Sequence, residues 1–235
     1  MSTARPKKIM VVFGTRPEAI KMCPLIKELK RRDSFSVKVC VTAQHRQMLD
    51  QVLDVFHVVP DYDLNIMQNK QDLFDITTHI LAGVRDVLKK EVPDVVLVHG
   101  DTTTTFAVAL ACFYLGISVG HVEAGLRTYN ILSPYPEEFN REVVSIVAAY
   151  NFAPTQQAAD NLLREGREKS SVYITGNTVI DAMDNTVAED YSHPILDWVG
   201  DSKMIFITAH RRENLGQPMR NMFRAIRRVL ASAHF

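Results

Sequence analysis

Residues 8–22 read KIMVVFGTRPEAIKM, and this stretch decides the fold. Residues 9–13 are all apolar, which is typical of a strand buried on both faces of a parallel sheet. Gly14, Thr15 and Arg16 then interrupt the run. Pro17 suits the first position of a helix, where no amide hydrogen is needed. The stretch therefore predicts a strand at 8–13, a tight loop and a helix at 17–31.

The same alternation of short β-branched runs with longer helical patterns continues to about residue 176. Further strands are expected at 37–42, 94–98, 117–122, 151–153 and 172–175, and further helices at 46–56, 71–91, 103–115, 137–149 and 156–165. Apolar strands joined by helices predict a parallel sheet covered on both faces. We therefore expect an α/β protein with a doubly wound, Rossmann-like sheet.

The pattern changes after Gly176. A helix at 179–187 leads into a stretch with proline and glycine at 192–200, followed by a strand at 203–208 and a helix at 218–231. One strand and one helix are too few to cover two faces of a sheet. We interpret residues 1–176 as an N-terminal Rossmann-like domain and residues 177–235 as the beginning of an incomplete second one.

Composition excludes several classes of protein. The 235 residues are 46% hydrophobic and 23% charged, as in ordinary globular proteins. Lys+Arg and Asp+Glu both number 27, so no global positive field favours nucleic acid or an anionic membrane as a partner. The longest apolar run, 106–117, is too short to span a bilayer. Three separated cysteines predict reduced thiols and a cytoplasmic location, with no metal centre.

Polar and charged residues follow several of the expected strands. Arg16 and Lys21 follow the first, Asp101 and four threonines (102–105) follow the strand at 94–98, and Glu123 follows the strand at 117–122. His210 and Arg211 follow the strand at 203–208. In open α/β sheets ligands bind outside the carboxyl ends of the strands. The mixture of cations and carboxylates indicates an anionic ligand with acid–base groups beside it.

Each of these residues also has a purely structural interpretation. Arg16 either binds phosphate at the helix N-terminus or makes a local ion pair. The threonines either cap the helix or also offer hydroxyls to a ligand. Glu137 and Arg141, four residues apart on one helix face, are favoured as a surface ion pair on spacing alone. No GxGxxG motif is present, so the sequence gives no sign of a nicotinamide cofactor.

The chain resembles the non-hydrolysing UDP-N-acetylglucosamine 2-epimerases of bacteria from about residue 8 to about residue 217. The resemblance rests on eight motifs in order: FGTRPEAIKM (13–22), VTAQHRQMLDQV (41–52), VPDYDLNIM (59–67), VLVHGDTTTT (96–105), GHVEAGLRT (120–128), SPYPEEFNR (133–141), ITGNTVIDA (174–182) and TAHRREN (208–214). It implies two Rossmann-like domains of glycosyltransferase-B type with a cleft between them, a homodimer and interconversion of UDP-GlcNAc and UDP-ManNAc.

The resemblance also assigns roles to residues. It implies that Asp101, Glu123 and Glu137 are acid–base or cation-stabilising carboxylates. It implies further that UDP and its phosphates are bound by Arg16, Lys21, Arg141, His210 and Arg211. UDP-GlcNAc as an activator is implied at a separate set of residues, namely Gln44, His45, Gln47 and Lys70. No cofactor and no metal belong to this reaction as the resemblance implies it.

Two other functions remain open from the sequence. One is a hydrolysing 2-epimerase, which would release UDP and free ManNAc, and the other is an inactive fragment that binds nucleotide sugar. Chains of the resembled family continue well past Phe235, through a Ser- and Gly-rich loop that holds the uridine diphosphate. We therefore expect weak or no epimerase activity from the 235 residues alone.

Overall fold

A computed structural model describes residues 5–43, 46–68, 70–187, 190–209 and 215–232. The chain divides into two compact units, Met1–Val187 and Ala188–Phe235. The first unit holds the sheet, and each unit is described by itself. Of the helices in the described ranges, none is long and apolar enough to cross a membrane.

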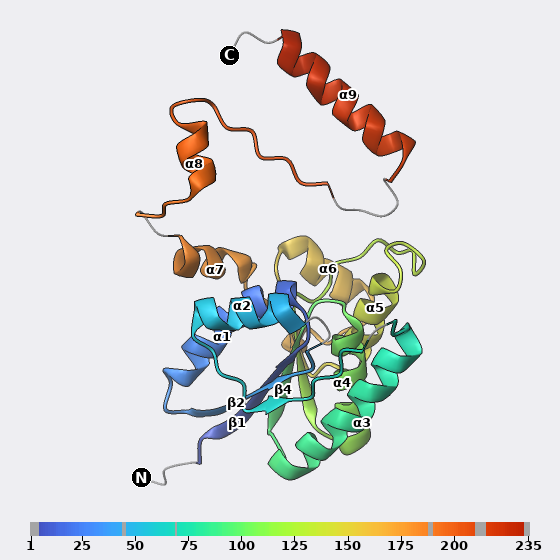
Figure 1. Cartoon of the computed structure of the whole chain (residues 1–235). Coiled ribbons are helices and arrows are strands. Elements are labelled where there is room, and N and C mark those ends of the chain that lie inside the picture. The colour runs from blue at the N-terminus through green and yellow to red at the C-terminus, as the bar shows by residue number, and fades with distance from the viewer. Residues whose placement is uncertain (1–4, 44–45, 69, 188–189, 210–214, 233–235) are drawn as a thin grey trace. The chain divides into compact units, whose positions relative to one another are not determined.

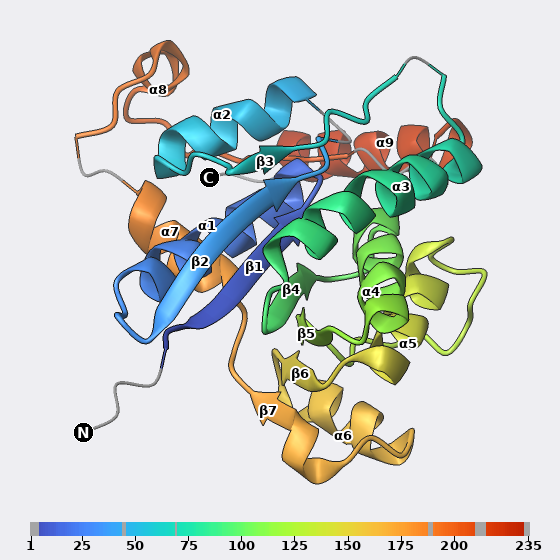
Figure 2. The ribbon, with the colours of Figure 1, turned by 90° about the horizontal axis from the view of Figure 1, so that it is seen from below.

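The first unit is built on seven parallel strands in the order β3-β2-β1-β4-β5-β6-β7 (Figures 1 and 2). The strands are β1 (Lys7–Phe13), β2 (Phe35–Val41), β3 (Tyr62–Asp63), β4 (Val95–His99), β5 (Ser118–Val122), β6 (Tyr150–Ala153) and β7 (Val172–Ile174). The order reverses direction between β1 and β4, which is the point where such sheets bind ligands. The expected doubly wound, Rossmann-like fold is confirmed.

Helices cover the sheet in two groups (Figure 2). The helices of this unit are α1 (Arg16–Lys30), α2 (Arg46–Phe56), α3 (Leu73–Glu91), α4 (Thr103–Leu115), α5 (Glu137–Val147), α6 (Gln156–Arg164) and α7 (Val179–Thr186). One group is α1, α2 and α7, which contact one another, and the other is the series α3, α4 and α5. A separate buried core lies under each group.

Local signals explain why the helices next to the β1–β4 reversal begin where they do. Thr15 and Glu18 form a capping box at the start of α1, with Pro17 in the first turn. Thr102 caps α4 by accepting a hydrogen bond from the Thr105 amide, and Gly116 ends that helix in the left-handed conformation that glycine adopts readily. Both helix N-termini therefore start directly after a strand of the sheet.

Three expected features differ in the structure. The two-residue strand β3 was not expected, because Tyr62 and Asp63 are too few to give a pattern. The short helix α8 (Pro194–Val199) occupies part of the stretch expected to be irregular. The expected strand at 203–208 is wrong, because residues 203–209 form no regular element. A β-branched run becomes a strand only when another strand supplies its hydrogen bonds, and no neighbour does so among the described residues.

The second unit contains α8 and α9 (Gln217–Ser232). The expected domain boundary at 176 differs from the division into compact units, which falls after Val187. Helix α7 lies in the first unit because Ala182 is buried in the core under α1 and α2. Whether residues 177–235 begin a second Rossmann-like domain stays a prediction.

Candidate functional site

The candidate site lies at the carboxyl ends of β1, β4 and β5, where hydrogen bonds tie three loops together. The Gly100 amide donates to the Val122 carbonyl at 2.9 Å and links the loops after β4 and β5. The His121 ring nitrogen Nε2 lies 2.7 Å from the Gly100 carbonyl oxygen and makes a second link. Asp101 and Glu123 each follow one of these linked residues directly. The structure therefore brings them to the same edge of the sheet.

Glu18 links the loop after β1 to the loop after β4. One oxygen of its fully buried carboxylate accepts from the amides of Gly14 and Thr15, at 3.0 and 2.7 Å. The other oxygen accepts from the hydroxyls of Thr102 and Thr105, at 2.8 and 3.3 Å. Sequence reasoning gave Glu18 no role, although the Thr-x-x-Glu spacing of a capping box marks its position.

The threonines after β4 serve the structure of this edge. Thr102 caps α4 and bonds to Glu18, and Thr105 bonds to Glu18 as well. Thr104 is buried, and its hydroxyl lies 3.1 Å from that of Thr42 on the chain after β2. A Cβ atom on Gly14 would lie 2.1 Å from the Thr42 hydroxyl, so this close approach requires glycine. The hydroxyls of Thr102, Thr104 and Thr105 each have a protein partner, which favours the structural interpretation for these three threonines.

Arg16 and Lys21 lie on α1 at this edge, in different environments. Arg16 is exposed at the first position of the helix, and it has no hydrogen bond or ion pair among the described residues. The Lys21 ammonium forms an ion pair with the Glu123 carboxylate. The free cation at a helix N-terminus is suited to an anion, because the helix dipole favours negative charge there.

Glu123 is held in an uncommon backbone conformation, with φ of 64° in the left-handed region. Its carboxylate is 15% exposed, pairs with Lys21 and lies 3.5 Å from Nε2 of His99. Burial raises the pKa of this carboxyl, but His99 and Lys21 together outweigh burial and bring the pKa to about 2. Glu123 is therefore ionised at neutral pH in this state.

Asp101 belongs to a second ionic cluster, with Arg141 and Glu138. The Arg141 guanidinium pairs with Asp101 and also lies 3.0 Å from the Glu138 carboxylate. Glu138 is fully buried, and its other oxygen accepts from the amides of Thr128 and Tyr129 at 2.6 and 2.8 Å. The arginine thus joins the loop after β4 to α5 and to the loop after β5.

The structure assigns different surroundings to the neighbouring residues Glu137 and Glu138. The sequence analysis proposed an ion pair between Glu137 and Arg141, but Arg141 pairs with Glu138 instead. Glu137 lies in the first turn of α5, partly exposed, and none of the described residues bonds to its carboxylate. Its expected role as an acid or base stays a prediction, as do the roles expected of Asp101 and Glu123.

The structure describes only two of the other expected site residues. His210, Arg211, Gln44 and His45 lie outside the described residues. Gln47 is exposed on α2, and Lys70 is exposed with φ of 63°. The structure therefore leaves the proposed activator residues untested.

Two buried histidines at this edge were missed by sequence reasoning. His99 ends β4 and is 4% exposed, and His121 on β5 is fully buried. Burial lowers the pKa of His121 to about 4, so its ring is neutral at neutral pH. No pattern distinguishes such histidines from core residues, since each stands among apolar neighbours in a strand.

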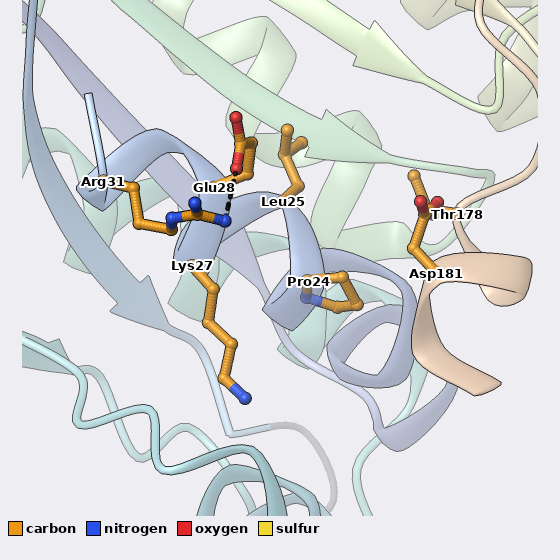
Figure 3. Close-up of a pocket in the computed structure, with 7 residues that line it drawn as sticks. All are labelled: Pro24, Leu25, Lys27, Glu28, Arg31, Thr178 and Asp181. Carbon is orange, nitrogen blue, oxygen red and sulfur yellow. Dashed lines mark hydrogen bonds and ion pairs between the residues drawn. The ribbon is translucent and has the colours of Figure 1, made fainter. Parts of the chain in front are cut away.

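A pocket of about 450 Å³ lies elsewhere, between α1 and α7 (Figure 3). Pro24, Leu25 and Lys27 line it together with Glu28, Arg31, Thr178 and Asp181. Figure 3 shows the ion pair between Glu28 and Arg31 on one wall. None of the expected site residues lines this pocket. In the described ranges, no three His, Cys, Asp or Glu side chains are grouped so that they could hold a metal ion.

Comparisons with known proteins identify the family of this chain. The family model described as UDP-N-acetylglucosamine 2-epimerase matches residues 27–235. The UDP-N-acetylglucosamine 2-epimerase of Bacillus subtilis (strain 168) is 61% identical over 223 residues, covering 95% of this chain and 59% of that protein.

Solved structures match as well. A Listeria monocytogenes crystal structure has a TM-score of 0.93 and 52% identity, over 98% of this chain and 61% of that one. The UDP-GlcNAc 2-epimerase of Neisseria meningitidis, solved with UDP-GlcNAc bound, has a TM-score of 0.86 and 51% identity, over 94% of this chain and 62% of that one. The chain thus spans about three fifths of the length of these relatives. It belongs to the UDP-N-acetylglucosamine 2-epimerase family.

Proposed function

We propose that this chain provides the phosphate-facing and proton-transfer groups of an enzyme that interconverts UDP-GlcNAc and UDP-ManNAc. The observation that carries the proposal is the arrangement at the carboxyl ends of β1, β4 and β5. Two carboxylates, Asp101 and Glu123, are each paired with a cation. Arg16, which pairs with none of the described residues, lies at a helix N-terminus at the same edge. Family membership and the UDP-GlcNAc bound to the Neisseria relative agree with this ligand class.

The chemistry explains why such a site needs both cations and carboxylates. The proton on C2 of the sugar is only weakly acidic, because C2 is not next to a carbonyl. Breaking the bond between C1 and the UDP oxygen leaves positive charge on the ring, which acidifies that proton. A base removes the proton, and the electron pair of the C–H bond forms a double bond between C1 and C2. UDP then adds back at C1 while an acid delivers a proton to the other face of C2.

The described residues suit these steps. Arg16, Lys21 and Arg141 supply positive charge for the departing diphosphate, whose negative charge grows as the bond to C1 breaks. Asp101, Glu123 and Glu137 supply the base, the acid and negative charge near the oxocarbenium-like ring. His210 and Arg211 remain proposed binders of UDP. No redox cofactor takes part in this proposal, because elimination and re-addition move only a proton and the UDP group, and neither step transfers a hydride.

The test follows the sugar and the solvent proton together. The 235-residue chain is incubated with UDP-GlcNAc in D₂O, and NMR follows C2, UDP and free sugar. The proposal expects UDP binding and slow formation of UDP-ManNAc with deuterium at C2. Free ManNAc with UDP would instead identify the hydrolysing reaction, and binding without turnover would identify a binding fragment. Absence of any UDP binding would refute the proposal.

We also propose a homodimer and an activating UDP-GlcNAc site. A mostly apolar groove between α3 and α4 is lined by residues that include Leu81, Ala111 and Tyr114, and the Phe113 ring beside it is 63% exposed. Such a surface is suited to a second copy of the chain. Phe113→Glu is expected to give a monomer in sedimentation, whereas the wild-type chain is expected to sediment as a dimer. An unchanged sedimentation coefficient would exclude this surface.

The activating site is proposed at Gln44, His45, Gln47 and Lys70. UDP-ManNAc turnover that does not depend on added UDP-GlcNAc would exclude activation. A cytoplasmic location is proposed as well, and the three free, buried cysteines support it, because reduced thiols are typical of that compartment.

A further inference from the structure

The Glu123 carboxylate lies between two groups that can hold it. On one side the Lys21 ammonium, from α1, pairs with its Oε2 oxygen. On the other side Nε2 of His99, at the end of β4, lies 3.5 Å from the same oxygen. That separation is too long for a good hydrogen bond. In this state the carboxylate therefore forms an ion pair with Lys21 and lies near His99 without a good hydrogen bond to it.

His99 Nε2 is a buried nitrogen without a hydrogen bond. The residue is 4% exposed, and none of the described residues makes a hydrogen bond to this atom. A buried polar atom left unpaired lowers stability, so native proteins rarely keep one without a reason. The nearby Glu123 oxygen is the group that would satisfy it, and a shift of about half an ångström would bring that oxygen within the usual range.

Binding of an anionic ligand to Lys21 would allow the Glu123 carboxylate to make that shift toward His99. Lys21 is a proposed binder of the UDP diphosphate, and a diphosphate carries more negative charge than a carboxylate. If the diphosphate binds the Lys21 ammonium, Glu123 loses its ion-pair partner although its side chain is largely buried, with 15% of it exposed. A carboxylate in such surroundings needs another donor.

We propose that His99 is a positioning residue that receives the Glu123 carboxylate when an anionic ligand takes Lys21. This inference rests on the proposed function, in which Lys21 binds the diphosphate and Glu123 transfers a proton. The consequence is a coupling between binding and proton transfer. In the state without ligand, His99 and Lys21 together bring the pKa of the carboxyl to about 2, and the carboxylate is a weak base. Loss of the Lys21 charge raises that pKa, because a neighbouring cation favours the ionised form.

The groups around Glu123 determine whether its pKa rises or falls when Lys21 is removed. Lys21 from α1 and His99 from β4 both lower the Glu123 pKa, and burial raises it. His121 on β5 is neutral at neutral pH, and its Nε2 already faces the Gly100 carbonyl. Removing Lys21 alone therefore raises the pKa of Glu123, and removing His99 as well leaves burial unopposed.

The first test needs no ligand. Lys21→Met removes the competing ammonium, so Glu123 is expected to bond to His99 in the free protein. The chemical shift of His99 Nε2 should then move in the direction that a new hydrogen bond produces. The pH at which half of the Glu123 carboxyl is ionised should rise by about 1–3 pH units. Lys38→Met is the matched control, because it removes a different ion pair, with Asp61 on the far side of β2.

Variants of His99 test its own part. In the Lys21→Met background, His99→Phe should raise the Glu123 midpoint above its ordinary value of 4.5, because only burial then acts. His99→Gln keeps an N–H donor and should restore most of the lower midpoint. If the midpoint in Lys21→Met is the same with histidine, phenylalanine or glutamine at this position, the proposal is wrong. Because the glutamine variant keeps a polar group of similar size, it guards against misfolding of the phenylalanine variant.

The second test adds UDP. In the wild-type chain, saturating UDP should produce the same His99 shift that Lys21→Met produces without ligand, and UDP should add nothing in Lys21→Met. If UDP causes no change anywhere in the spectrum, the proposed function fails, while the ligand-free variants still decide the role of His99. If UDP binds and shifts other resonances but leaves His99 unchanged, the transfer of Glu123 to His99 is refuted and the proposed function stands.

Discussion

Replacing Glu18 by alanine should destabilise the first unit severely, although Glu18 contacts no proposed ligand. The wild-type carboxylate accepts from the amides of Gly14 and Thr15, and Gly14 is itself buried. Alanine leaves both amides without a partner. The hydroxyl of Thr105 is less affected, because it also bonds to the His99 carbonyl.

The magnitude follows from the two orphaned amides. Each buried donor left unpaired costs about 1–3 kcal/mol, so Glu18→Ala should lower the free energy of unfolding by about 2–6 kcal/mol. Glu18→Gln keeps one carbonyl oxygen for the two amides, loses the charge, and replaces the oxygen that accepts from Thr102 and Thr105 with an NH2 donor. The difference between charged and neutral hydrogen bonds predicts a smaller loss, about 1–2 kcal/mol.

Urea unfolding followed by circular dichroism at 222 nm measures both variants. Glu28→Ala is the control, because Glu28 lies on the same helix, is partly exposed and, among the described residues, pairs with Arg31 and Arg32 alone. We expect the highest urea midpoint for wild type and Glu28→Ala, which should be equal, a lower one for Glu18→Gln and the lowest for Glu18→Ala. A Glu18→Ala midpoint equal to that of the control would refute the role of Glu18 as the link between the loops.

Three further predictions concern the same edge of the sheet. Gly125→Ala should abolish folding or lower the melting temperature strongly, because φ is 86° and the added Cβ would lie 2.2 Å from a carbonyl oxygen of α6. Gly166→Ala is the control: φ is 81° but no atom lies near the added Cβ, so the free energy of unfolding should fall by only about 1 kcal/mol. Glu123 has a pKa of about 2 in the folded protein against an ordinary 4.5, so its ionised carboxylate stabilises the fold by on the order of 3 kcal/mol above pH 4.5. This stabilisation is lost as the pH falls through 2. The urea midpoints of wild type and Glu123→Gln should therefore converge in acid, and a difference that stays constant with pH would contradict this. Arg141→Met should cost about 3–5 kcal/mol in the same unfolding assay, because it leaves the fully buried Glu138 carboxylate without its cation, and a loss below 1 kcal/mol would exclude this ionic cluster as a stabilising feature.

The sheet could be predicted from sequence because its strands are short apolar runs separated by helical patterns. The expected helices at 46–56 and 103–115 coincide with α2 and α4 at both ends. The position of the site followed from one rule, that parallel strands bring their carboxyl ends to the same edge. Hence Asp101 and Glu123 could be placed near each other before any coordinates were known.

The partners of the charged residues could not be predicted in the same way. Glu137 and Glu138 are neighbours at the start of α5, and helix phase alone decides which one turns inward to Arg141. That phase depends on the conformation of the loop 128–136, whose course no pattern specifies. The expected strand at 203–208 failed for a different reason, because strand formation depends on a partner distant in sequence.

We propose that the loops after β1, β4 and β5 form one ligand site for a diphosphate. Backbone amide NMR of the 235-residue chain titrated with UDP measures this binding residue by residue. We expect saturable shifts at Arg16, Asp101 and Glu123 with one shared dissociation constant, and little change along α3. Shifts confined to the pocket beside Lys27 and Asp181, or separate dissociation constants for the three loops, would contradict it.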